Sequence, residues 1–244
     1  MVLSSNIGSA GFAVAGFSLL AMTYLADTQF VGVITREDGI AENVSALFYA
    51  GGLAVSLYAL YKGRRVWLAS LWAILCLLFL GEETSWFQRF FDYSVPYVEA
   101  RSTQSEFNLH NLDIFGHGKG RFLDADGNVQ FTQKSILSTQ NLFRVGFFGY
   151  FLVLPLLFQF AQTRNFLRRF GYAPPAWQFL LAAMTVIFVS LVLAFATEPP
   201  VRSYIAEMRE LIYAAVIFIY TLGFHWRAQD SETDFAPSRL NEGH

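Results

Sequence analysis

Six long apolar runs alternate with shorter polar segments along this chain. The runs cover residues 7–26, 43–61, 66–81, 142–161, 176–196 and 204–224. Each run is close to the roughly 20 residues that an α-helix needs to cross a hydrocarbon core of about 30 Å. Because lipid cannot satisfy free backbone groups, only helices or a closed barrel can span it. The pattern therefore predicts an all-α integral membrane bundle of six transmembrane helices.

The predicted organisation is a single transmembrane domain over residues 1–228. Its spans are expected at about 7–26, 43–61, 66–91, 141–162, 176–197 and 203–226. The segment 92–139 is then a long extracytoplasmic loop, and the Asp126-Gly127 pair predicts a short hairpin within residues 120–132. Residues 229–244 are polar and lack periodicity, so a disordered cytoplasmic tail is expected.

Composition supports the membrane prediction and narrows the function. Hydrophobic residues make up 54% of the chain and charged residues 15%, whereas soluble domains carry about 25% charged residues. The single cysteine, Cys76, excludes an intrachain disulfide. A net charge of -2 without a basic face gives no surface for nucleic acid.

Basic residues in the short loops predict the orientation. They are Lys62, Arg64 and Arg65 after the second run, Arg164, Arg168 and Arg169 after the fourth, and Arg227 after the sixth. Segments rich in Lys and Arg face the cytoplasm. Both termini are therefore expected inside the cell and the long loop outside it.

Five acidic residues fall at one predicted membrane depth. They are Glu42, Glu82, Glu83, Glu207 and Glu210. At about 1.5 Å rise per residue, Glu82 lies about 25 Å beyond Arg65, and Glu210 lies about 25 Å beyond Arg227. Glu42 and Arg144 come out near the outer edge by the same rise. Ionisable groups at such depth are costly and usually functional.

These acids also have structural interpretations. Glu42, Glu207 and Glu210 lie in first helical turns, where the helix dipole favours a carboxylate by about 0.3–1 kcal/mol. Glu82 and Glu83 are adjacent like charges near a helix C-terminus, so a positive group or a shared proton must offset them. A structural network with Arg89, Arg144, Arg202 and Arg209 would also offset this charge.

A more specific hypothesis is that these residues bind a divalent metal ion: iron, zinc or manganese. Carboxylate oxygen and imidazole suit such ions, and the predicted ligands are Glu82, His110, Glu207 and Glu210. Glu83, His110 and Gln88 are the predicted catalytic residues, with Glu83 as general base. Residues expected to orient the substrate or the ligands are Asn108, Asn111, Arg144, Arg202 and Glu42.

Three strings carry a resemblance: EDGIAE at 37–42, GEETSWFQR at 81–89 and NLHNL at 108–112. They resemble uncharacterised bacterial polytopic membrane proteins with an E-E-x-S-W-x-Q-R segment followed by N-x-H-N. The resemblance implies a bacterial cytoplasmic membrane and one shared site, and it implies no substrate.

The expected function is that of a membrane-embedded enzyme that acts on a lipid or another amphiphile at the outer face of the membrane. The enzyme is metal-dependent if the predicted ligands hold an ion. Membrane lipids are the expected partners. A carrier or proton-coupled transporter would use the same carboxylates as protonation sites. A non-catalytic subunit of a membrane complex, whose acids form salt bridges to membrane-protein partners, is the third alternative.

Overall fold

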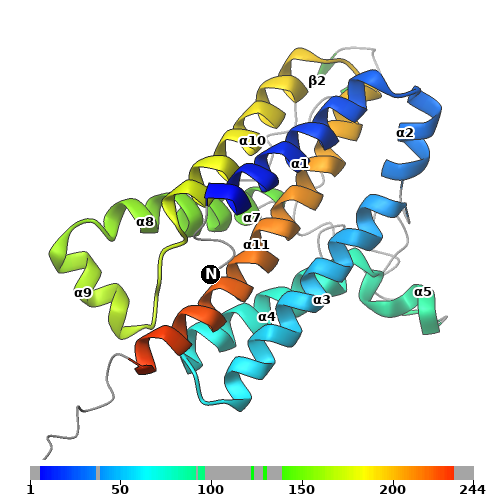
Figure 1. Cartoon of the computed structure of the whole chain (residues 1–244). Helices are drawn as coiled ribbons and strands as arrows, with labels where there is room; N and C mark the ends of the chain where they lie inside the picture. The colour runs from blue at the N-terminus through cyan, green and yellow to red at the C-terminus, as the bar shows by residue number, and fades with distance from the viewer. Residues whose placement is uncertain are drawn as a thin grey trace, which may run out of the picture.

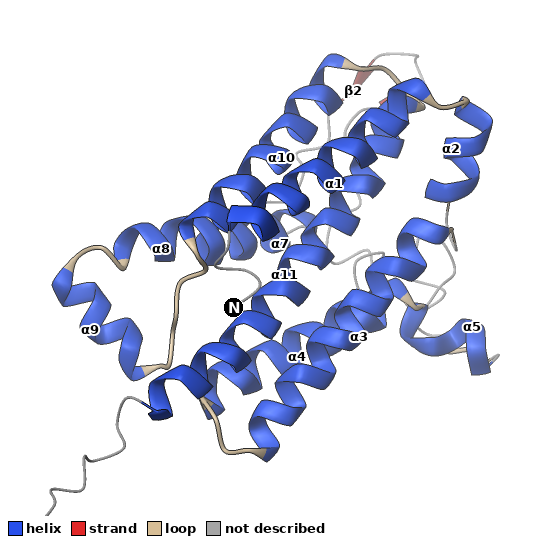
Figure 2. Ribbon diagram, viewed as in Figure 1, coloured by secondary structure: helices blue, strands red, loops and turns tan. Residues whose placement is uncertain are grey.

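The computed structural model describes residues 6–36, 39–91, 93–96, 122–123, 129–130 and 139–233. The elements before the long loop are α1 (Asn6–Leu25), α2 (Thr28–Thr35), α3 (Ile40–Tyr61), α4 (Val66–Glu83), the short turn η1 (Ser85–Phe87) and α5 (Gln88–Phe91). Those after it are α7 (Thr139–Phe148), the π-helical turn η4 (Gly149–Val153), α8 (Leu154–Leu157), α9 (Ala161–Arg169), α10 (Trp177–Ala196) and α11 (Val201–Thr233) (Figures 1 and 2). The predicted helical class is confirmed.

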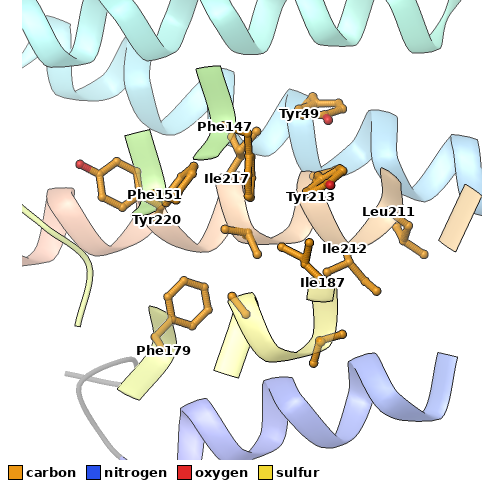
Figure 3. Close-up of a cluster of buried hydrophobic side chains, with 14 of the residues drawn as sticks. Tyr49, Phe147, Phe151, Phe179, Ile187, Leu211, Ile212, Tyr213, Ile217 and Tyr220 are labelled. Atoms are coloured by element: carbon orange, nitrogen blue, oxygen red, sulfur yellow. The ribbon is translucent and has the colours of Figure 1, made fainter. Parts of the chain in front are cut away.

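Helix α11 runs through the centre of the bundle. It packs against α3 and α10, while α4 covers α3 and α1 covers α10 (Figure 1). Its residues Ile205, Met208, Ala214 and Ile217 are almost completely buried. Figure 3 shows the aromatic and aliphatic side chains that meet around this helix from both sides.

Five segments are long and apolar enough to cross a membrane. They are Gly8–Leu25, Thr28–Tyr61, Val66–Glu83, Gln140–Leu157 and Trp177–Ala196. Large apolar side chains cover their outer faces: Phe195 is 90% exposed, Trp67 76% and Leu47 69%. A soluble monomer rarely exposes apolar surface on this scale, so the surface fits a protein surrounded by lipid.

The sixth predicted span falls within α11 and is not among these five segments. Glu207, Arg209 and Glu210 interrupt the apolar character of its first half. The helix also continues to Thr233, past the predicted domain boundary at residue 228. No proline occurs between Pro200 and Pro237, so the sequence has no strong breaker in this stretch.

Residues 27–42, between the first two predicted spans, contain the helix α2. Asp27 caps it, since its Oδ1 accepts hydrogen bonds from the backbone N–H groups of Gln29 at 2.7 Å and Phe30 at 3.3 Å. Such a cap satisfies N–H groups that have no partner within the helix.

The third and fourth spans are shorter than predicted. Helix α4 ends at Glu83 where the sequence predicts a span to residue 91, and the fourth span ends at Leu157 where the prediction is 162. In the fourth span, the Leu154 N–H bonds the Gly149 carbonyl in the π register. The next donor in that register would be residue 155, and Pro155 has no N–H. The Tyr172 hydroxyl donates to the Tyr150 carbonyl instead, at 3.3 Å.

A second set of hydrogen bonds ties this part of the bundle together. The Trp72 indole donates to the Tyr150 hydroxyl at 3.2 Å, and that hydroxyl lies 2.6 Å from the Tyr220 hydroxyl. Tyr220 donates in turn to the Ala173 carbonyl at 2.9 Å. The aromatic polar groups of α4, η4 and α11 are thereby satisfied inside an apolar core, which fixes their relative positions.

Two short strands lie in the long loop. β1 (Phe122–Leu123) pairs antiparallel with β2 (Val129–Gln130), with Phe122 opposite Gln130 and Leu123 opposite Val129. The Asp126-Gly127 turn predicted between them lies outside the described residues.

Candidate functional site

The structure gathers carboxyl groups from three helices around Glu83. The Glu83 carboxyl lies within electrostatic range of those of Glu210, Glu42, Glu207 and Glu82, in decreasing order of influence. Glu42 is in the first turn of α3, Glu82 and Glu83 end α4, and the other two lie on α11. We call these five residues the acidic cluster.

A left-handed turn directly follows α4 and lies next to Glu82 and Glu83 of this cluster. Ser85, Trp86 and Phe87 have φ values of 47°, 52° and 65°. For residues with a side chain, this conformation costs about 1–2 kcal/mol each. Such strain persists only where surrounding contacts hold it, and it concentrates at functional sites.

The contacts of Trp86 stabilise the turn and hold Glu82. Its indole Nε1 donates to Glu82 Oε1 at 2.9 Å, and its carbonyl accepts a hydrogen bond from the Tyr93 hydroxyl at 2.7 Å. The indole ring also lies against Gly81, where the methyl carbon of an alanine would come within 2.8 Å of the ring. Gly81 is therefore required for this close approach. Thr84 closes the helix end by donating to the Leu80 carbonyl at 2.8 Å.

Helix α11 contributes an accessible acid in a buried environment. From Tyr204 to Thr221, Glu210 is the single exposed residue, and its neighbours Arg209 and Leu211 are buried. Glu210 is therefore the most accessible acid of this stretch.

Two tyrosines and two arginines complete the site. Tyr49 of α3 interacts electrostatically with Glu83 and Glu210, and Tyr213 of α11 interacts with Arg209, Arg144 and Glu210. Figure 3 shows Tyr49 and Tyr213 on facing elements. By hydrogen-bond geometry, neither Nη1 of Arg209 nor the Tyr213 hydroxyl, both buried, has a partner within the described part of the chain, although the two side chains lie near enough to interact with each other. Buried polar groups without a partner are uncommon and indicate a place for water or a ligand.

The sequence predicts the five acids and Arg144 as site residues and names Arg209 as a counter-charge in a structural network, but it points to neither Tyr49 nor Tyr213. A helical spacing could have pointed to both tyrosines. Tyr49 follows Glu42 by seven residues and Tyr213 follows Glu210 by three, so each shares a helix face with its acid.

The other predicted site residues have different positions. Arg202 donates to the Thr197 carbonyl at 2.9 Å and lies 4.0 Å from Glu198, so its described contacts are at the α10–α11 turn. Gln88 begins α5, directly after the left-handed turn. Asn108, His110 and Asn111 lie outside the described residues.

The predicted metal site is not formed by the described residues alone. Within the ranges that the structure describes, no group of three or more His, Cys, Asp or Glu residues could hold a metal ion. The predicted ligand His110 is outside those ranges, so the metal stays a prediction.

Comparisons with protein-family models, with curated proteins and with solved structures find no match for this chain. Its class is therefore defined by its own structure. It is a helical bundle with five membrane-length apolar helical segments and an acidic cluster where α3, α4 and α11 meet.

Proposed function

We propose that this chain is a membrane-embedded enzyme of six transmembrane helices, with α11 as the sixth, that acts on a lipid or another amphiphile. Its reaction uses the acidic cluster for acid/base chemistry at the outer face of the cytoplasmic membrane. One observation carries the proposal: between Tyr204 and Thr221 of the central helix, Glu210 is the one exposed residue, and its carboxyl is within electrostatic range of Glu83.

The gathering of acids around Glu83 supports a shared proton. The carboxyl groups of four other acids act on Glu83, while the guanidinium groups of Arg209 and Arg144 act on Tyr213. Like charges at short range in a poorly hydrated site cannot all ionise without a compensating partner. In the proposed reaction Glu83 and Glu210 share a proton, which Glu83 gives to or takes from the substrate.

The unpartnered donors have a role in the same reaction. Nη1 of Arg209 and the Tyr213 hydroxyl are already fixed in place by burial. Donors held in advance stabilise negative charge as it develops on a substrate oxygen. We assign them to binding an anionic or carbonyl oxygen of the substrate.

The surroundings favour an amphiphilic substrate. Ile40, two residues before Glu42, is 59% exposed, and Phe91 of α5 is 74% exposed. Exposed apolar side chains close in sequence to the acids of α3 and α4 suit a molecule with a polar head and an acyl chain. A divalent metal held by Glu82, His110, Glu207 and Glu210 would supply activated water to the same reaction.

A carrier would use the same carboxylates, but transporter sites usually lie near the middle of the bilayer. Glu83 is the last residue of α4, and Glu42 is the third residue of α3. Their position at helix ends favours chemistry at one membrane face.

The test compares Glu83→Gln and Glu210→Gln with the unchanged protein. Each purified protein is incubated with a total bacterial lipid extract, and lipid species are followed by mass spectrometry. We expect a lipid conversion that both substitutions abolish. Glu198→Gln is the matched control, since Glu198 is an exposed acid at the α10–α11 turn. If no lipid changes, and Glu83→Gln instead removes proton uptake into proteoliposomes, the carrier alternative replaces the enzyme.

A further inference from the structure

Helix α9 (Ala161–Arg169) separates apolar and basic residues onto two faces. Phe166 and Phe170 are four residues apart and lie side by side, with ring centroids 5.1 Å apart. They are 56% and 53% exposed, and no residue of the helix is buried. The opposite face carries Arg164 and Arg168, also four residues apart. The helix is thus amphipathic. The rest of the bundle leaves both of its faces at least partly exposed.

The described contacts of the basic face are with uncharged groups. Arg164 Nη2 donates to the Gln159 carbonyl at 3.2 Å, and the Arg168 guanidinium lies over the Phe158 ring at 5.7 Å. Neither these residues nor Arg169 form an ion pair with an acidic residue whose side chain the structure describes. The sequence of α9 itself contains no acid. A carbonyl and an aromatic ring leave the positive charge in place, so these arginines can still bind an anion.

A second basic segment joins the same surface. Arg65, in the α3–α4 loop, donates from Nη1 to the Gly171 carbonyl at 3.1 Å, directly after α9. In the same loop, the Lys62 ammonium lies over the Tyr61 ring at 5.2 Å. Tyr61 and Trp67 are both strongly exposed. Exposed Tyr and Trp at helix ends are typical of the membrane–water interface.

We propose that α9 and the α3–α4 loop bind the anionic headgroups of membrane lipids, at the end of the bundle opposite the acidic cluster. Phe166 and Phe170 enter the acyl boundary, Arg164 and Arg168 on the opposite face meet the headgroups, and Arg169 reaches them from the end of the helix. Basic amphipathic helices lie in the interface plane, and each basic residue gains from an anionic leaflet. In the view of Figure 1, α9 runs across the direction of the long bundle helices, as a helix in that plane must.

The test places an environment-sensitive fluorophore on α9. A Phe166→Cys variant is labelled and reconstituted in nanodiscs of phosphatidylcholine, with or without phosphatidylglycerol. Cys76 is buried, so the unsubstituted protein serves as the labelling blank. We expect a blue shift of emission and stronger quenching by spin-labelled lipid only where phosphatidylglycerol is present. Added salt should reverse both effects.

Two triple variants identify the cause. Replacing Arg164, Arg168 and Arg169 by Gln should abolish the response, and replacing them by Lys should retain most of it because the charge is kept. An equal shift in neutral and anionic nanodiscs would overturn the proposal. A salt-insensitive shift that depends on the protein-to-lipid ratio would also overturn it, since it would place a second protein copy on α9. The salt and Lys measurements decide the question even if the Gln variant does not fold.

Discussion

The indole Nε1 of Trp86 donates a hydrogen bond of 2.9 Å to Oε1 of Glu82, from within a left-handed turn. This contact links a strained backbone segment to the first acid of the acidic cluster. The turn follows α4 directly. Its left-handed conformation at Ser85, Trp86 and Phe87 brings the Trp86 indole back to Glu82 and so helps to orient the end of α4.

Trp86→Phe should therefore strongly reduce lipid conversion while changing the melting temperature only slightly. The variant keeps most of the ring and loses the hydrogen bond, which is worth about 1.5–3 kcal/mol when the acceptor is charged. Melting curves and the lipid-conversion assay are compared with those of Trp67→Phe, an exposed site. Equal effects at the two positions would remove Trp86 from the site.

Gly81→Ala should destabilise the protein by about 1–3 kcal/mol, because the added methyl group would overlap the Trp86 ring. Gly146→Ala is the matched control, since nothing lies within 4 Å of the carbon it would add. That change should be neutral or stabilising by up to about 1 kcal/mol, the usual preference for Ala over Gly in a helix. Denaturation in detergent measures both.

The acids should behave as one unit. Glu83→Gln and Glu210→Gln should each abolish lipid conversion, and the double variant should add little, because residues that act together lose most of the effect at the first removal. Each single variant should keep or gain thermal stability in the absence of metal, since it relieves like-charge repulsion. Strong destabilisation by both would indicate a structural Arg–Glu layer instead.

A strong chelator tests the metal. If Glu82, His110, Glu207 and Glu210 hold a divalent ion, the chelator should lower the melting temperature of the unchanged protein. The same treatment should not affect the Glu210→Gln and His110→Ala variants. If the melting temperature of the unsubstituted protein does not change, and elemental analysis finds no metal, the metal is excluded. Proton transfer by the acidic cluster would then be the remaining chemistry.

Reporter fusions test the orientation. Fusions after residue 63 and after residue 230 should behave as cytoplasmic and one at residue 125 as exported. An exported signal at residue 63 would place the acidic cluster inside the cell and the basic α9 surface outside it.

The sequence was most informative where charge stands out against an apolar background. Glu42, Glu82, Glu83, Glu207 and Glu210 were grouped from helix rise alone, because spans of equal length bring their ends to one level. Tyr49 and Tyr213 were missed since tyrosine is common in any membrane bundle, and only side-chain direction distinguishes these two.

Helix ends were predicted less well than helix positions. The end of α4 depends on a left-handed turn at residues with side chains, and no propensity favours that conformation at Ser85, Trp86 or Phe87. Tertiary contacts of Trp86 decide it. The π-helical turn inside the fourth span likewise involves Tyr172, whose hydrogen bond to Tyr150 no local pattern indicates.

Tyr172→Phe should lower the free energy of unfolding by about 1–3 kcal/mol, measured by denaturation in detergent, because the Tyr150 carbonyl would lose its donor. Burial, followed by the charge of the nearby Tyr220 hydroxyl, raises the pKa of Tyr172 above its usual value, so the donor proton is retained at neutral pH. Pro155→Ala restores a backbone N–H at the position that would serve Tyr150. The cost of Tyr172→Phe should therefore be smaller in that background, and Tyr61→Phe, at an exposed tyrosine, is the control.

The Tyr172 hydrogen bond also sets an order of events during synthesis. Its donor lies 22 residues beyond the carbonyl that it serves, and Arg65 holds the adjacent Gly171 from 106 residues upstream. When the fourth span leaves the ribosome, the Tyr150 carbonyl has no partner until the connection to α10 has been translated and has docked beside α4. This span is therefore expected to enter the bilayer together with its successor, as a pair of helices inserted jointly.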